Sequence, residues 1–160
     1  MRAIVALGSN LGDRAAHLQA GLGALAALGT IVPSPLTVET ADESGTGPDY
    51  LNSVALLDAP PADPRRLLEA MLRIELILGR DRSRGRNAPR TLDLDLITVE
   101  GWQGQWHWPA PPDLAGLGPE LSLELPHPRA QGRDFVLAPL EALVRSLGED
   151  AAWTGLRENR

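Results

Sequence analysis

One stretch of this sequence reads Thr91-Leu92-Asp93-Leu94-Asp95-Leu96-Ile97. Strict alternation of this kind predicts a β-strand, because successive side chains of a strand point to opposite faces. The leucines would therefore enter a core, and Asp93 and Asp95 would stand on the other face, roughly 6.5–7 Å apart. That spacing lets two carboxylates hold one or two hard divalent cations and leaves further positions for phosphate oxygens. The alternative is an amphipathic strand with a solvated acidic face.

The elements around this strand predict an α+β fold. A helix precedes it, with Asp63 as N-cap, Pro64 in the first turn and Gly79 just past its end. Four strands and two helices follow the order βαββαβ, which favours a single ferredoxin-like domain over residues 1–160, with the helices on one face of an antiparallel sheet. The strands are expected at residues 2–8, 30–40, 50–57 and 92–99, and the first helix at about 14–28, with Asp13 as its N-cap.

Three further segments complete the predicted frame. The loop Ala41–Asp49 joins the second and third strands, and its Gly45, Gly47 and Pro48 offer no side-chain anchor. Residues 100–126 are rich in Gly, Pro and Trp and predict a short hairpin, and a final helix is expected over about 137–147.

Two histidines, His17 and His107, have no metal-ligand partner at a suitable spacing and are expected on the surface.

Composition narrows the classes of function. The chain has 160 residues and a mass of 17.1 kDa, and 43% of its residues are hydrophobic, which suits one domain with a buried core. A formal net charge of −6 argues against a general nucleic-acid binder, whose surface is basic. The absence of cysteine removes thiolate chemistry and fits a reducing cytoplasm. No apolar run is long enough to span a membrane, and no signal-peptide pattern is visible at the start.

The basic residues of the chain are all arginines, and they concentrate just before the acidic strand. Without lysine, phosphate groups would be bound by guanidinium forks, backbone amides or metal. A cationic loop followed by two carboxylates is the charge pattern of a metal–polyphosphate site. The alternative is a solvated basic loop that pairs with acidic surface. The concentration comprises Arg80, Arg82, Arg84, Arg86 and Arg90, of which Arg84 is expected to face solvent.

Four blocks of sequence occur in a fixed order from Ala3 to about Leu140. They read Gly8-Ser9-Asn10-Leu11-Gly12-Asp13, Pro48-Asp49-Tyr50-Leu51-Asn52, Gly79-Arg80 with Ala88-Pro89-Arg90-Thr91-Leu92-Asp93-Leu94-Asp95, and Pro126-His127-Pro128-Arg129 with Arg133 and Phe135. Together they resemble the hydroxymethyl-dihydropterin pyrophosphokinase family of folate biosynthesis. The run from Pro89 to Asp95 is highly specific to that family.

This resemblance implies that the chain moves the terminal diphosphate of ATP to the hydroxymethyl group of a reduced pterin, with attack on the β-phosphorus and release of AMP. It implies that Asp93 and Asp95 hold two magnesium ions. Arg80 and Arg90 would engage the triphosphate and stabilise the transferred charge. The remaining nucleotide-binding positions that the resemblance implies are Glu75, Arg82, Arg86, His127 and Arg133.

The resemblance also implies a pterin site. Tyr50 and Phe135 would contact the ring, Asn52 would bind its donor and acceptor edge, and Thr40 would meet it through the backbone.

Three features depart from the family pattern. Asn87 stands where a tryptophan is frequent in the family, and residues 41–48 lack the Pro-Pro-Leu run of many members. The stretch between Asp95 and His127 is also long.

Two other functions are compatible with the same residues. The carboxylate pair could serve a metal-dependent nucleotidyltransferase or phosphohydrolase, or the chain could be a non-catalytic ATP-binding module, since this architecture hosts many functions. The identity of the products separates these possibilities. In each case the expected partners are small molecules, without nucleic acid or membrane, and the protein is expected to act as a cytoplasmic monomer.

Overall fold

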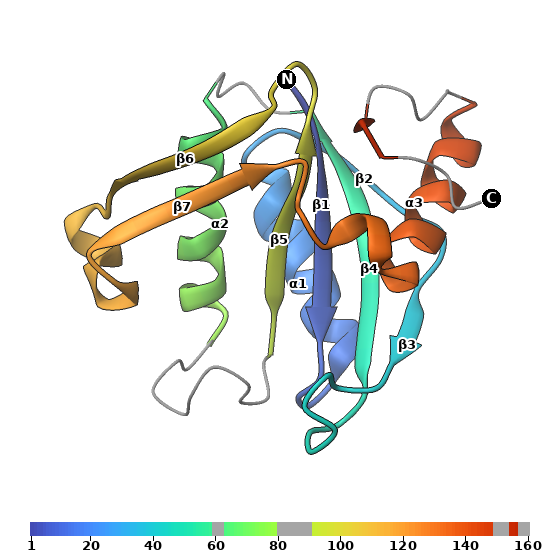
Figure 1. The fold of residues 1–160 in the computed structure, drawn as a ribbon. Helices are drawn as coiled ribbons and strands as arrows, with labels where there is room; N and C mark the ends of the chain where they lie inside the picture. The colour runs from blue at the N-terminus through green and yellow to red at the C-terminus, as the bar shows by residue number, and fades with distance from the viewer. Residues whose placement is uncertain (59–62, 80–90, 149–153, 157–160) are drawn as a thin grey trace.

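The structure, a computed structural model, describes residues 1–58, 63–79, 91–148 and 154–156 of the chain. Figure 1 shows a central sheet with helices on both sides and a separate two-stranded hairpin. Among the helices that the structure describes, none has the length and apolar character of a membrane span. The elements are β1 (Arg2–Ser9), α1 (Arg14–Ala26), β2 (Thr30–Pro33), β3 (Val38–Thr40), β4 (Tyr50–Asp58), α2 (Pro64–Ile77), β5 (Asp93–Val99), β6 (Gly104–Pro109), η2 (Pro112–Leu117), β7 (Glu120–Leu125), η3 (Ala130–Gly132) and α3 (Asp134–Leu147).

The main sheet is antiparallel at every pairing. Its strands follow the order β2-β4-β1-β5, and the short β3 also pairs with β4. β1 is therefore an interior strand, bonded to β4 on one side and β5 on the other. The predicted α+β class, with helices packed on an antiparallel sheet, is confirmed.

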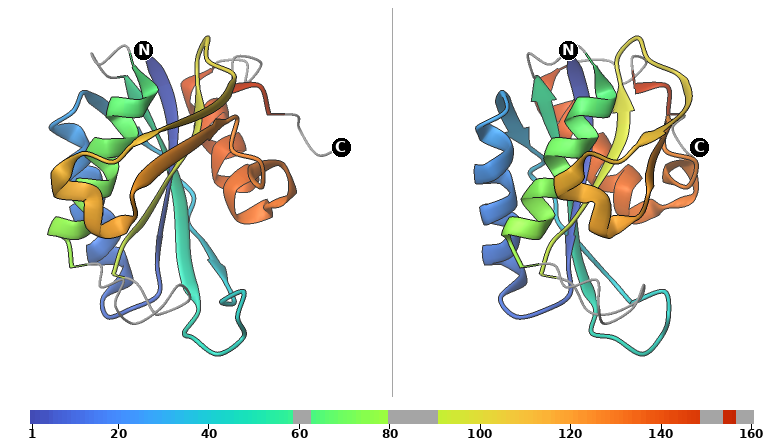
Figure 2. Two further views of the ribbon diagram at one scale, coloured as in Figure 1. Left: turned by 60° about the vertical axis from the view of Figure 1, so that its left-hand side comes forward. Right: turned by 90° about the vertical axis from the view of Figure 1, so that its left-hand side faces the viewer.

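Two apolar cores lie on opposite faces of this sheet. On one face, α1 and α2 bury Leu25 and Leu67 together with Val5 of β1. On the other face, α3 buries Leu143 together with Ile4 of the same strand. Figure 2 shows the two helix layers with the sheet between them. The expectation that the two helices of the βαββαβ unit pack on one face is confirmed for α1 and α2. The final helix, for which no face was predicted, is α3, and its apolar side is buried against the second face.

The predicted N-caps of α1 and α2 and the predicted glycine after α2 are confirmed. Asp13 Oδ1 accepts a hydrogen bond from the backbone N–H of Ala16 at 3.1 Å, and Asp63 Oδ1 accepts one from Arg65 N at 2.9 Å. Each carboxylate thus satisfies a backbone donor that a helix start leaves without a partner. Gly79 follows α2 with a φ of 94°, a conformation that favours glycine.

The segment 30–40 forms two strands instead of the single strand that was predicted. Between β2 and β3 the chain leaves its regular pairing at Ser34, which bonds to Val54 O through its backbone N–H at 2.9 Å and to Pro139 O through its hydroxyl at 2.7 Å. Pro35 follows and has no N–H to offer a ladder. The β2 and β3 segments therefore pair with different parts of β4.

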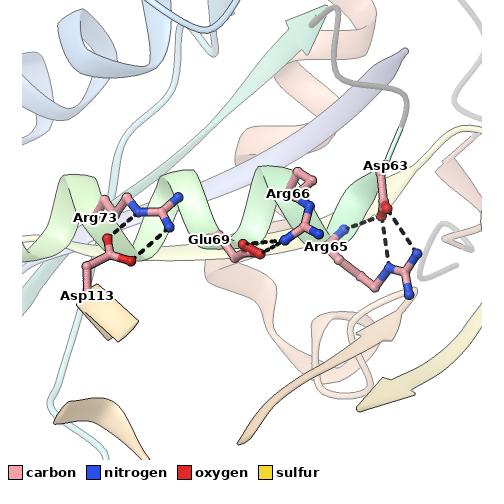
Figure 3. A network of polar contacts seen from close by, with 6 residues as sticks. All are labelled: Asp63, Arg65, Arg66, Glu69, Arg73 and Asp113. Carbon is pink, nitrogen blue, oxygen red and sulfur yellow. Dashed lines mark hydrogen bonds and ion pairs between the residues drawn. The ribbon is translucent and has the colours of Figure 1, made fainter. Parts of the chain in front are cut away.

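The predicted hairpin in residues 100–126 is confirmed as β6 and β7, joined through η2. Figures 1 and 2 show it lying across α2. Leu123 and Leu125 of β7 join the core beneath, and the three tryptophans of this segment pack against it. The Arg73 guanidinium of α2 donates to the Asp113 carboxylate of η2 at 2.6 and 3.1 Å, as Figure 3 shows. This long segment therefore covers α2.

The N-cap of α2 gives a test of the fold. Figure 3 shows Arg65 beside Asp63, and hydrogen bonds from the Arg65 side chain hold the pKa of Asp63 below its usual 3.8. We predict that Asp63→Ala lowers the free energy of unfolding at neutral pH by about 1 kcal/mol, measured by urea unfolding.

The pH dependence of this difference follows from the direction of the pKa shift. Because the folded state lowers the pKa of Asp63, the ionised carboxylate stabilises the protein above its unfolded pKa, and this contribution is lost as pH falls through the folded pKa. The difference in the free energy of unfolding between wild type and Asp63→Ala should therefore become smaller at acidic pH. Asp63→Asn, which keeps an acceptor oxygen, is the matched control and should lose less stability at neutral pH. A gap that stays constant into strong acid would contradict the role of the ionised cap.

Candidate active site

A cavity of about 500 Å³ lies against the sheet near the start of α3. β1, β4, β5, one side of α2 and the segment that leads into α3 all contribute to its walls. Nine residues that the sequence proposed as functional fall within the described part of the chain, and all nine line this one cavity. They are Thr40, Tyr50, Asn52, Glu75, Asp93, Asp95, His127, Arg133 and Phe135.

Strand register determines the floor of the cavity. Gly8 of β1 pairs with Asn52 of β4 on one side and with Asp93 of β5 on the other. Ala6, two residues earlier in β1, pairs with Asp95. Residues paired directly across a sheet share a face, and residues two apart in a strand share it too. The two aspartates and Asn52 therefore project from one face, on either side of a strand that carries only small side chains there.

The small residues of β1 leave the room that the cavity occupies. A Cβ atom at Gly8 would lie 3.2 Å from Asn52 Oδ1 and 3.4 Å from a ring carbon of Tyr50. Such contacts are tighter than ordinary packing. Sequence analysis placed Gly8 in a motif but did not identify it as part of the site, because its role depends on the side chains of β4.

The predicted alternation along β5 is confirmed. Leu92, Leu94 and Leu96 are buried in the core with α1 and α2, whereas the two aspartates are half-buried and line the cavity on the opposite face. The alternative of a fully solvated acidic face does not describe them.

Glu75 reaches the same strand from α2. It is only 2% exposed, and its Oε2 accepts a hydrogen bond from the backbone N–H of Leu94 at 3.1 Å. Leu94 lies between the two aspartates in β5, the last strand in the sheet order, and is paired with Leu7 of β1. The buried carboxylate of Glu75 thus fixes the strand from which both aspartates project.

His127 contributes a neutral imidazole to the cavity from the segment before α3, where its backbone N–H donates to Ile97 O of β5 at 2.7 Å. Burial lowers its pKa below the usual 6.5, and the positive charges of Arg133 and Arg129 lower it further, against opposing effects of Glu124 and Asp93. Its Nδ1 accepts the backbone N–H of Arg129 at 3.2 Å, which leaves the ring proton on Nε2. His127 is therefore a hydrogen-bond donor through Nε2 at neutral pH.

Asn52 has its amide nitrogen engaged within the sheet. Nδ2 donates to Thr40 Oγ1 at 2.9 Å and to Val38 O at 3.1 Å. This leaves the carbonyl oxygen Oδ1, which lies beside Gly8, as the acceptor that Asn52 presents to the cavity.

The loop Ala41–Asp49 has a side-chain anchor at Asp42, a residue that the sequence analysis did not consider. The Asp42 carboxylate accepts hydrogen bonds from the backbone N–H groups of Ser44 at 3.4 Å and Gly47 at 3.0 Å, and from the Ser44 hydroxyl. A Cβ at Gly47 would lie 2.6 Å from Asp42 Oδ2, so the anchor needs glycine at that position. An aspartate two residues before a serine, with glycines following, is a turn signal that sequence analysis could have used.

The other predicted residues cannot be located. Arg80, Arg82, Arg86 and Arg90 lie outside the described residues. Within the described part of the chain, no group of three or more His, Asp or Glu side chains gathers as a metal site. A cation at the two aspartates would therefore take its other ligands from a bound substrate, from water or from the remainder of the chain.

Charges of opposite sign line this cavity from two directions. The sheet contributes Asp93 and Asp95, and the segment that leads into α3 contributes Arg129 and Arg133. A polyphosphate with its cations would find a partner for each charge between these walls, an arrangement typical of phosphoryl-transfer enzymes.

Comparison with known proteins gives the family. The family model described as 7,8-dihydro-6-hydroxymethylpterin-pyrophosphokinase (HPPK) matches residues 4–145. The 2-amino-4-hydroxy-6-hydroxymethyldihydropteridine pyrophosphokinase of Methylorubrum extorquens is 34% identical over 148 residues, which cover 91% of this chain and 84% of that protein. The protein of the same name from Pseudomonas aeruginosa is 37% identical over 149 residues, covering 91% and 82%. The chain belongs to the HPPK family, as the sequence predicted.

The Asp42 anchor can be tested directly. We predict that Asp42→Ala speeds hydrogen exchange of the peptide containing Gly47 several-fold, since the backbone donors of this turn lose their acceptor. Exchange in β1 should not change. Asp42→Asn is the matched control, because it keeps one acceptor oxygen, and it should have the smaller effect. Hydrogen exchange is monitored by mass spectrometry. If the loop exchanges equally fast in wild type and in Asp42→Ala, the loop is held by other contacts.

Proposed function

We propose that this cavity transfers the diphosphate of ATP to the hydroxymethyl group of 6-hydroxymethyl-7,8-dihydropterin and releases AMP, a reaction of folate biosynthesis. Membership in the HPPK family supports the activity. The observation that carries the proposal for this cavity is that Asp93, Asp95, His127 and Arg133 line it together with the aromatic and amide groups of Tyr50, Asn52 and Phe135.

In this reaction the hydroxymethyl oxygen attacks the β-phosphorus, and the bond from that phosphorus to the oxygen bridging to the α-phosphorus breaks. AMP leaves with that oxygen, and the proton of the hydroxyl passes to solvent. Catalysis of this kind depends on positioning and on neutralising charge more than on a strong base. A site of carboxylates, guanidinium groups and a neutral histidine suits that requirement.

The donor set of β5 fits magnesium. Carboxylate oxygens are the hard ligands that this ion prefers, and it commonly takes the rest of its ligands from phosphates and water. We propose that Asp93 and Asp95 hold two magnesium ions. When bound, the ions would neutralise charge on the phosphate oxygens. Glu75 is then a positioning residue, since its bond to the Leu94 N–H holds the strand between the two carboxylates.

We assign nucleotide binding to the segment that leads into α3, which carries His127 and Arg133. His127 would donate its Nε2–H to an oxygen of ATP, since Nδ1 already accepts a bond from Arg129 N. Arg133 would contribute a guanidinium to the phosphates. By the family resemblance we also assign Arg80 and Arg90 to the triphosphate and to the transferred charge. Arg82 and Arg86 are assigned to nucleotide binding on the same basis.

The pterin is assigned to the end of the cavity at β4. Asn52 would accept an N–H of the pterin edge through Oδ1, because its amide nitrogen is already bonded to Thr40 and Val38. Tyr50 and Phe135 would contact the ring, and Thr40 would meet it through its backbone.

We further propose a ferredoxin-like frame for a single domain over residues 1–160. The antiparallel order β2-β4-β1-β5, with α1 and α2 on one face, supports this. From composition and charge we propose a monomer that acts in the cytoplasm on small molecules.

The activity is tested by product analysis. We expect AMP and the pterin diphosphate in equal amounts when the protein is incubated with ATP, Mg²⁺ and 6-hydroxymethyl-7,8-dihydropterin, with both products identified by mass spectrometry. Omission of Mg²⁺, with a chelator present, should abolish both. Formation of inorganic phosphate or pyrophosphate instead would support the phosphohydrolase or nucleotidyltransferase alternative.

The metal assignment is tested by Asp95→Asn. We predict a loss of at least roughly a hundredfold in kcat with little change in thermal stability, because the side chain lines the cavity and lies outside both cores. Asp58→Asn at the far end of β4, whose partner is the N-terminal amine, is the matched control and should keep full activity. Near-normal turnover of Asp95→Asn in saturating Mg²⁺ would reject the assignment.

A further inference from the structure

Glu43 and Arg133 form an ion pair across the mouth of the cavity. Arg133 Nη2 donates to Glu43 Oε1 at 3.2 Å, and both residues line the cavity. Glu43 lies in the loop after β3, and Arg133 is the N-cap residue of α3, 90 positions later in the chain. The Glu43 side chain is 70% exposed, so its role in the core of the fold is small, whereas the Arg133 side chain is only 19% exposed.

Each partner is held in place by its own surroundings. Glu43 follows directly on Asp42, whose carboxylate closes the turn on Ser44 and Gly47. The Arg133 guanidinium lies over the ring of Phe135, 5.4 Å from the ring centre. The pair therefore joins the loop that borders the proposed pterin site to a guanidinium assigned to the nucleotide.

The positive charge around Arg133 favours the binding of an anion. Arg133 stands at the N-terminus of α3, where the helix dipole is positive and Asp134 contributes the acidic side chain of the first turn, and the Arg133 side chain makes no capping bond. Arg129 also lines this wall, and its charge is felt at His127 together with that of Arg133. Glu43 accepts a bond from Nη2 of this guanidinium, and its carboxylate repels the like charge of a phosphate oxygen, so a phosphate oxygen that takes the same N–H must displace Glu43.

We propose that Glu43 is a positioning residue that competes with the phosphates of ATP for Arg133 and thereby sets the nucleotide affinity of this enzyme. The proposal rests on the proposed function, since it takes Arg133 as a nucleotide contact. In the free protein Glu43 holds the guanidinium over Phe135. ATP must displace Glu43 before its phosphates can bind Arg133. Because the ion pair has to break, the affinity for ATP is lower than it would be without Glu43.

The size of the effect follows from the exposure of the pair. A partly exposed ion pair contributes little, so removing the competitor should tighten ATP binding by roughly two- to fivefold. Glu43→Gln removes the charge, and Glu43→Ala removes the acceptor as well, so Glu43→Ala should tighten binding at least as much. Because the competitor acts on binding, KM for ATP should fall while kcat stays unchanged.

The test is calorimetric titration of the full chain with a non-hydrolysable ATP analogue and Mg²⁺ at low ionic strength. Glu39→Gln is the matched control. It removes the same charge from the other side of the loop, where Glu39 pairs with Arg14 outside the cavity, and it should leave the affinity unchanged. In an Arg133→Met background, which binds the analogue more weakly, Glu43→Gln should have no further effect.

Four outcomes would overturn the proposal. Unchanged affinity of Glu43→Gln, with normal binding by wild type, contradicts the competition alone and leaves the proposed function in place. If Glu39→Gln raises the affinity for the analogue as much as Glu43→Gln does, general charge repulsion acts instead of competition for Arg133. The same conclusion follows if Glu43→Gln raises this affinity equally in the Arg133→Met background. A wild-type protein that does not bind the analogue at all would contradict the proposed function and this inference together.

Discussion

The pairing of β1 with its two neighbours is the constraint on which the site depends. Because β1 bonds to β4 on one side and β5 on the other, Gly8 stands in line with Asn52 and Asp93 on a single face of the sheet. A shift of one residue in either pairing would turn these side chains toward the core of α1 and α2. The same register sends Leu94 into that core, so the hydrophobic effect that stabilises the fold also orients the carboxylates.

α3 and the segment before it make the second wall. Arg133 and Arg129 face the cavity there, and they lower the pKa of His127 in addition to burial. The imidazole stays neutral and donates through one nitrogen, while the guanidinium groups carry the positive charge. In the proposed function, the carboxylates on the sheet would hold the cations, and the donors of the segment before α3 would bind the phosphate oxygens.

A carboxylate turn centred on Asp42 orders the loop after β3. Asn10 and Arg14 hold the end of the loop through the carbonyls of Pro48 and Asp49. These contacts carry Glu43 to the cavity mouth, where it meets Arg133.

The alternation along β5 and the caps at Asp13 and Asp63 followed from short-range patterns in the sequence, and the nine predicted residues that line the cavity were named through the resemblance to a family. The split of β2 from β3, the position of α3 on the second face, and the meeting of Glu43 with Arg133 did not follow from either. Alternation and capping depend on backbone geometry within a few residues, which a sequence specifies directly. Which residues face each other across a cavity depends on how segments distant in the sequence pack together, and only the tertiary structure determines this packing.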